Sequence, residues 1–139
     1  MIRTLSYVFP ILLVLLLSHC KDKENPVPDV YVNITIDMND ASYNDLVPGN
    51  YKNITGGLSG IILYRKTFNE FSAIERTCPY EAEFNTRVTV IPDNTLFMEC
   101  DSCKSRYYIE DGALIEGPSK FPLNQYKTTF DGRFLRIYN

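Results

Sequence analysis

The chain has 139 residues, which is enough for one domain of ordinary size. Hydrophobic residues make up 45% of it and charged residues 22%, and this balance argues against intrinsic disorder. The net charge is −3 and no basic run is present, so nucleic acid is not expected as a partner.

The first 19 residues have the pattern of a secretory signal peptide. Arg3 supplies a positive charge, and an apolar run follows from residue 5 to residue 17. A membrane-spanning helix needs about 20 apolar residues, so this run is too short to span comfortably. Residues 17–20, Leu-Ser-His-Cys, resemble the lipobox of bacterial lipoproteins, which implies cleavage before Cys20 and lipid on its sulfur. The alternative is an uncleaved membrane anchor.

Residues 20–29 are charged and then rich in proline, so we predict a flexible tether that buries no apolar area. The charged run at 21–24 resembles the surface-export tag of some outer-membrane lipoproteins. We therefore expect a protein of the cell envelope, held at the outer membrane by lipid and facing the periplasm or the cell surface. Cleavage would also remove His19, the only histidine.

The rest of the chain, residues 30–139, predicts a single antiparallel all-β domain. Apolar and polar side chains alternate from Val30 to Met38, which is typical of a half-buried strand. Further short extended segments are separated by turn residues, at about ten-residue spacing. They lie at 51–55, 61–65, 71–77, 87–91, 96–99, 106–109, 114–116, 123–130 and 133–138. None of these segments shows a sustained helical period, and about nine strands of this kind predict a sandwich.

Residues 56–60, Gly-Gly-Leu-Ser-Gly, form a glycine cluster. A phosphate-binding loop would need a lysine and a following helix, and neither is present. We predict instead a hairpin corner in which glycines take positive φ angles. The apolar run 61–65 that follows predicts a buried strand.

Two cysteine loops are joined by a predicted hairpin over residues 87–99. Cys78 follows the strand before this hairpin, and Cys100 and Cys103 follow its second strand. Because a hairpin brings its ends together, the three thiols are expected to lie within a few ångströms of one another. A mature chain without histidine excludes a Ser-His or Cys-His nucleophile, and we expect no catalytic residues.

The order of these elements resembles the Rieske domain from about residue 56 to the C-terminus. In that family the first loop is Cys-x-His and the second is Cys-x-x-His. On the resemblance, Cys78 and Cys100 match the cysteine ligands, while Tyr80 and Cys103 stand where the histidines belong.

The resemblance extends to residues that support the site. Ser105 matches a serine whose hydroxyl in the family hydrogen-bonds a bridging sulfide, and Tyr107 matches the aromatic residue after it. Gly117 and Pro118 match a Gly-Pro segment that packs behind the cluster. The resemblance thus implies a Rieske-like sandwich with both cysteine loops at one tip.

A Rieske centre requires two histidines, so it cannot be built by this mature chain. We predict a lipid-anchored structural or interaction module that lacks a cluster and has Cys78 in a disulfide with Cys100 or Cys103. An unknown protein of the envelope would be its partner. The alternative is an electron-transfer protein with an altered [2Fe–2S] cluster on Cys78, Tyr80, Cys100 and Cys103. A Cys100–Cys103 redox pair, and a zinc site that adds Asp101, are further alternatives.

Overall fold

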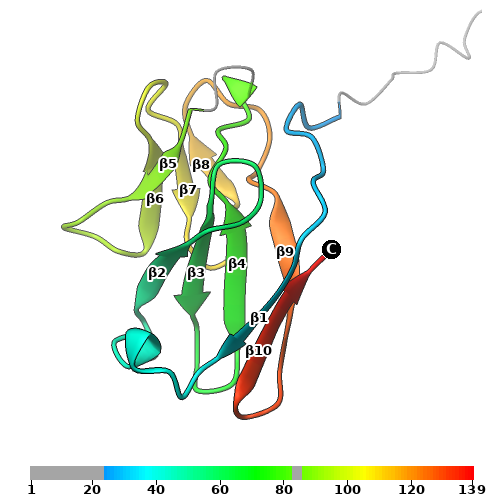
Figure 1. Ribbon diagram of the computed structural model, residues 1–139. Coiled ribbons are helices and arrows are strands. Elements are labelled where there is room, and N and C mark those ends of the chain that lie inside the picture. The colour runs from blue at the N-terminus through cyan, green and yellow to red at the C-terminus, as the bar shows by residue number, and fades with distance from the viewer. Residues whose placement is uncertain (1–23, 83–85) are drawn as a thin grey trace, which may run out of the picture.

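A computed structural model describes residues 24–82 and 86–139 of the chain (Figure 1). Within these ranges the chain forms ten strands and one short 3-10 helix. They are β1 (Asn33–Asp37), η1 (Ala41–Tyr43), β2 (Tyr51–Ile54), β3 (Ile61–Arg65), β4 (Phe71–Glu75), β5 (Val88–Val90), β6 (Phe97–Cys100), β7 (Arg106–Tyr108), β8 (Leu114–Glu116), β9 (Gln125–Phe130) and β10 (Phe134–Tyr138). No helix in the described residues has the length and apolar character needed to cross a membrane. The predicted signal peptide and Cys20 lie outside the described residues.

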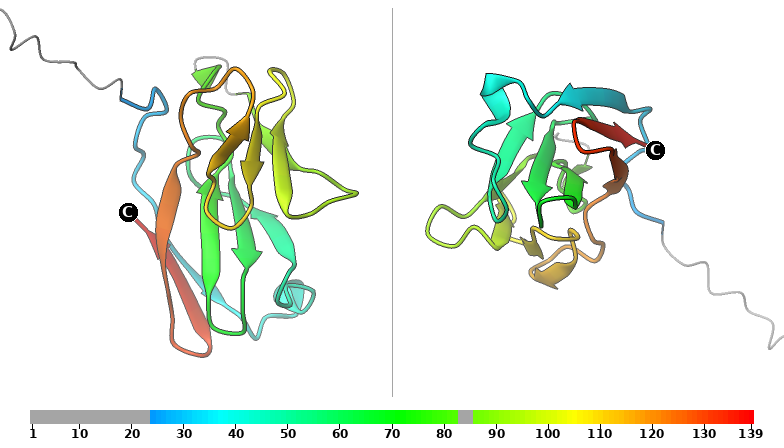
Figure 2. Two further views of the ribbon diagram at one scale, coloured as in Figure 1. Left: turned by 180° about the vertical axis from the view of Figure 1, so that it is seen from behind. Right: turned by 90° about the horizontal axis from the view of Figure 1, so that it is seen from below.

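The strands form two antiparallel sheets. Six strands follow the order β1-β10-β9-β4-β3-β2, and four follow the order β5-β6-β7-β8. Figure 1 and the rear view in Figure 2 show the smaller sheet beside one end of β3 and β4. The predicted all-β sandwich is therefore confirmed, with ten strands in place of about nine.

The β3–β4 pair is buried on both faces, which explains its continuous apolar sequence. Alternate side chains enter two separate cores, because successive residues of a strand point to opposite faces. Ile62 and Ile74 pack toward the small sheet, in the same core as Cys78 and Cys100. The other side chains of these two strands point to the opposite face and form a second core with residues of β1 and β10. They are Ile61, Leu63, Phe71 and Ala73. The cysteines thus lie at the edge of a packed core.

The glycine cluster is a corner fixed by a buried carboxylate. Glu75 ends β4 and is only 1% exposed. Its oxygens accept hydrogen bonds from the backbone N–H groups of Leu58 and Ser59, at 2.8 and 2.9 Å. The N–H and hydroxyl of Thr77 and the hydroxyl of Tyr126 donate three more. Burial acts to raise the pKa of Glu75, but these hydrogen bonds outweigh it and lower the pKa.

Only glycine fits at position 57 of this corner. Gly57 has a φ angle of +62°, and a Cβ atom there would lie 2.1 Å from a carboxylate oxygen of Glu75. The prediction of a corner with positive φ is confirmed. The corner's inward N–H groups, at 58 and 59, bind Glu75 and are not free for a phosphate.

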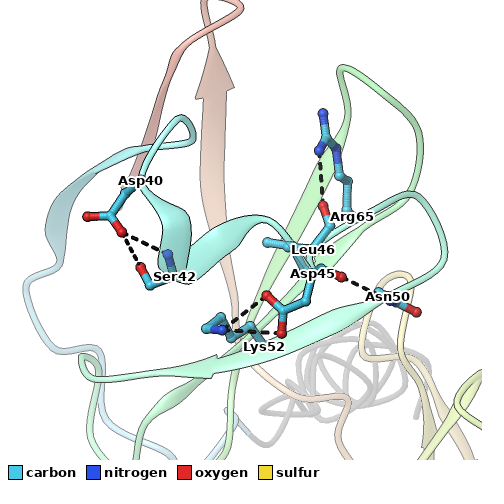
Figure 3. A network of polar contacts seen from close by, with 7 residues as sticks. All are labelled: Asp40, Ser42, Asp45, Leu46, Asn50, Lys52 and Arg65. Atoms are coloured by element: carbon cyan, nitrogen blue, oxygen red, sulfur yellow. Dashed lines mark hydrogen bonds and ion pairs between the residues drawn. The ribbon is translucent and has the colours of Figure 1, made fainter.

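The loop from η1 to β2 lies at the end of the molecule opposite the loop after β4 and the β6–β7 loop (Figure 1), and a set of polar contacts holds it there (Figure 3). Arg65 donates to the carbonyl of Leu46 at 3.0 Å, and Asn50 donates to the carbonyl of Asp45 at 2.9 Å. Lys52 forms an ion pair with the Asp45 carboxylate at 3.2 Å. These contacts hold Leu46 in the core beneath β1 and β10, where it is 1% exposed.

The described part of the predicted tether lies against the domain. The amide of Asn25 donates to the carbonyl of Pro122 and to the side chain of Asn124, at 3.0 and 2.9 Å. Asn124 donates in turn to the carbonyl of Val27, whose side chain is buried. Residues 25–27 are therefore docked beside the start of β9.

Candidate functional site: a three-cysteine tip

Two loops place the cysteines at one end of the domain. After β4 the chain makes an isolated bridge between Thr77 and Arg87, and the N–H of Cys78 donates to the carbonyl of Thr86 at 2.8 Å. Cys100 ends β6 opposite Val88 of β5. Figures 1 and 2 show the loop after β4 and the β6–β7 loop at the same end.

The three sulfur atoms converge as predicted. The Sγ atoms of Cys78, Cys100 and Cys103 all lie within 4.8 Å of one another. Cys78 and Cys100 are buried, whereas Cys103 is half-buried. The Cys78 and Cys103 sulfurs are 3.5 Å apart and are free thiols in this structure. Cys103, at a histidine position of the Rieske pattern, thus faces into the site.

The β6–β7 loop is a tight turn. The N–H of Lys104 donates to the carbonyl of Cys100 at 3.1 Å, and Lys104 takes a φ angle of +61°. Cys100 donates its own N–H to the carbonyl of Ser105 at 2.9 Å. This turn directs the Cys103 sulfur back toward Cys78.

Ser105 links the cysteines to the segment behind them. Its hydroxyl oxygen lies 3.1 Å from the Cys103 sulfur and accepts the N–H of Ser119 at 3.0 Å. Gly117 has a φ angle of +116°, and a Cβ atom there would lie 2.5 Å from the Ser105 Cα. The segment containing Gly117 and Pro118 therefore packs directly on Ser105. Ser119 was not predicted from the sequence, although its place directly after Gly-Pro is a usable signal.

Two tyrosines differ sharply in their relation to the sulfurs. Tyr107 is fully buried, and its hydroxyl lies 3.9 Å from the Cys78 sulfur. Tyr80 as a whole is 55% exposed, and its backbone N–H is directed at the Cys78 sulfur. The sequence predicted Tyr80 as a candidate ligand and Tyr107 only as a supporting aromatic. A ligand role for Tyr80 stays a prediction.

The thiols have unequal acidities. Burial raises the pKa of Cys100 to about 12, and the Cys78 thiol beside it adds to the shift. Burial also raises the pKa of Cys78. Burial acts the same way on Cys103, but hydrogen bonds from the hydroxyl and the N–H of Ser105 outweigh it and lower the pKa. Cys103 is therefore the most acidic and most accessible thiol of the tip, the two properties that govern cysteine reactivity.

This arrangement supports thiol chemistry better than acid–base catalysis. Burial raises the pKa of Tyr107, so its hydroxyl keeps its proton and remains neutral and does not supply a negatively charged ligand. The three cysteine sulfurs lie within 4.8 Å of one another. Among the described residues, no other set of three or more cysteine, histidine, aspartate or glutamate side chains brings its ligand atoms together in this way. Three clustered thiols can form one disulfide with a thiol left over, or bind a thiophilic metal.

No protein-family model and no curated protein sequence matches the chain. Solved structures that are similar to it in fold include the three that follow. One is a ferredoxin of carbazole 1,9a-dioxygenase from Nocardioides aromaticivorans, with a TM-score of 0.51 and 17% identity, covering 79% of this chain and 98% of that chain. Another is a ferredoxin in complex with the oxygenase of carbazole 1,9a-dioxygenase, with a TM-score of 0.48 and 19% identity, covering 76% and 93%.

The third is an NADH-dependent nitrite reductase small subunit from Mycobacterium tuberculosis, with a TM-score of 0.48 and 16% identity, covering 80% and 97%. The likeness to the Nocardioides ferredoxin shows that the chain has a Rieske-like ferredoxin fold. At 17% identity it shows the fold and no more than the fold.

Proposed function

We propose that this protein is a lipid-anchored domain of the cell envelope that acts as a structural or interaction module. Its Rieske-like tip would be closed by a disulfide between Cys78 and Cys103 instead of a cluster. The observation that carries the proposal is the 3.5 Å approach of these two sulfurs across the two loops. Cys103 stands where the Rieske pattern has its second histidine. A cysteine at this position removes a histidine ligand of the cluster and provides a thiol that can pair with Cys78.

Forming this bond requires a modest movement. A disulfide has an S–S length of about 2.05 Å, so the sulfurs would approach by roughly 1.5 Å. The Cys103 thiolate would attack a disulfide of an envelope thiol oxidant, and the Cys78 thiolate would then displace that oxidant. The two thiols lose two protons and two electrons, and the oxidant is reduced to a dithiol. Cys100, with its pKa raised by burial, would remain a thiol.

The anchor and the docked N-terminal segment would together hold the domain near the bilayer. Only three residues separate Cys20 from Glu24, and four steps of extended chain span at most about 14 Å. Residues 25–27 are fixed beside Pro122 and Asn124. This segment lies toward the same end as the cysteine loops (Figure 2). A lipid on Cys20 would therefore favour a partner in or close to the membrane.

The second candidate is electron transfer through an altered [2Fe–2S] cluster. The ferredoxin-like fold and the convergence of three thiols favour it. The donor set fits poorly, because two irons need a fourth protein ligand and Tyr80, the candidate for it, is exposed. Colour and iron content separate the two candidates directly.

The test uses the full-length chain, expressed with its own leader and extracted in mild detergent without reductant. Free thiols are alkylated, and the peptides that contain Cys78, Cys100 and Cys103 are analysed by mass spectrometry. The proposal predicts a colourless protein with a Cys78–Cys103 crosslink and alkylated Cys100. A brown protein with two irons and two sulfides per chain would support the cluster instead. Three alkylated cysteines in a colourless protein would contradict both.

A further inference from the structure

The donor atoms of the tip do not suit a Rieske cluster. That cluster takes two cysteines on one iron and two histidines on the other. The only histidine of the chain is His19, outside the β domain. Of the two substituted positions, Cys103 turns its sulfur toward the other two cysteines, while Tyr80 is 55% exposed. The three inward sulfurs are one ligand short of what two irons require.

We infer that the reduced tip binds a single thiophilic d¹⁰ cation, Zn²⁺ or Cu⁺, through Cys78, Cys100 and Cys103. This inference concerns the reduced form of the site on which the proposed function rests. A tetrahedral zinc ion with Zn–S bonds of about 2.3 Å separates its sulfurs by about 3.8 Å. The Cys78 and Cys103 sulfurs are 3.5 Å apart and no two of the three sulfurs are more than 4.8 Å apart, so they already lie close to the corners of one coordination face.

Groups around the sulfurs are those that stabilise bound thiolates. The backbone N–H of Tyr80 is directed at the Cys78 sulfur, those of Cys103 and Ser102 at the Cys100 sulfur, and that of Ser105 at the Cys103 sulfur. The Cys103 thiol donates to the Ser105 hydroxyl oxygen at 3.1 Å, and that oxygen also accepts the N–H of Ser119. Once Cys103 loses its proton, the Ser105 hydroxyl can turn and donate to the thiolate. Outer hydrogen bonds of this kind fix ligand orientation and tune metal affinity.

The chemistry of binding is a proton exchange without electron transfer. Three S–H bonds break, three sulfur–metal bonds form, and three protons pass to solvent, as metal binding to thiols requires. Bound Zn²⁺ would leave the site with a net charge of −1. Cys103 is the half-buried member, so the fourth tetrahedral position for Zn²⁺ opens on its side and is filled by water. Cu⁺ would need no fourth ligand.

The experiment titrates the full-length detergent-extracted protein, fully reduced with a phosphine under anaerobic conditions. Zn²⁺ and Cu⁺ are added separately against chromophoric chelators, and proton release is followed with a weakly buffered indicator. The expected result is one metal per chain with close to three protons released below the thiol pKa values. Whichever ion competes better against its chelator identifies the cation. Co²⁺ replacing Zn²⁺ should give the intense visible bands of a tetrahedral thiolate site.

Variants then assign the ligands. Cys103→Ser should weaken binding by more than ~100-fold, the upper end for outer-shell changes, and Ser105→Ala by about 10-fold. Ser42→Ala is the control, because Ser42 is exposed and its hydroxyl bonds Asp40, away from the cysteine loops. Circular dichroism checks that each variant is folded.

Three outcomes would overturn the inference. They are no binding by the reduced wild type, binding that survives replacement of all three cysteines, and reconstitution with two irons and sulfide. The first leaves the disulfide proposal intact, because that proposal is tested on unreduced protein. Conversely, one bound metal in the reduced protein together with no crosslink in the unreduced protein would retain this inference and reject the disulfide.

Discussion

Replacing the buried Glu75 by glutamine tests whether one carboxylate holds the glycine corner on β4. The carboxylate accepts five hydrogen bonds, three at one oxygen and two at the other. In Glu75→Gln the amide oxygen can keep the three bonds from Ser59 and Thr77. The amide nitrogen would then face the N–H of Leu58, and a buried donor is left without an acceptor. Tyr126 can rotate its hydroxyl and accept from the amide.

The expected loss follows from these bonds. A hydrogen bond to a charged group contributes about 1.5–3 kcal/mol, and one such bond is lost while the others become neutral. Part of this loss is offset, because glutamine carries no charge and its burial costs less free energy than burial of a carboxylate. We expect Glu75→Gln to lower the free energy of unfolding by about 2–4 kcal/mol at pH 7. Glu110→Gln is the control, because Glu110 is exposed, and its effect should stay within about 0.5 kcal/mol.

The same variant predicts a pH dependence with a definite sign. The hydrogen bonds lower the pKa of Glu75 in the folded protein. Its stabilisation is therefore complete above the unfolded pKa of about 4.3, and is lost as pH falls through the lower folded value. Urea unfolding at pH 7 and near pH 3.5 should show the gap between wild type and variant shrinking in acid. Equal stability at pH 7, or a gap that does not depend on pH, would refute this account of the corner.

Three further predictions concern the tip and the anchor. Gly117→Ala should destabilise the domain by about 2–4 kcal/mol because its Cβ would overlap Ser105. Gly132→Ala is the control, because Gly132 has a similar φ angle but open space around it and so measures the backbone strain alone. If thermal unfolding shows equal losses of stability for the two variants, overlap with Ser105 is excluded as the cause. Adding reductant should lower the free energy of unfolding of the wild type by about 3.5 kcal/mol, the value expected for a disulfide that spans 25 residues. The stability of Cys103→Ser should not change with reductant. If the stability of the wild type does not change either, the disulfide is absent. Cys20→Ala should release the protein from the membrane fraction, and an uncleaved variant that remains there would disprove the lipoprotein interpretation.

Much of the site follows from local sequence. Residues 71–77 are predicted to be a strand, and the two-residue period of a strand puts Ala73 and Glu75 on one face and Ile74 on the other, as the two cores show. The hairpin between the cysteine loops predicted that three thiols would meet. Both predictions depend only on the two-residue period of a strand and on the closure of a hairpin, which are properties of neighbouring residues.

The sequence by itself therefore determined the all-β class, the buried central strand and the meeting of the cysteine loops. Tertiary structure alone decided that the Tyr107 hydroxyl lies 3.9 Å from the Cys78 sulfur while Tyr80 is 55% exposed, and that residues 25–27 dock at Asn124. It also decided that Glu75 is buried with its charge satisfied, because the donors come from 17 residues before it and 51 after it. Which distant groups meet depends on how the two sheets pack, and no local pattern of residues encodes that packing.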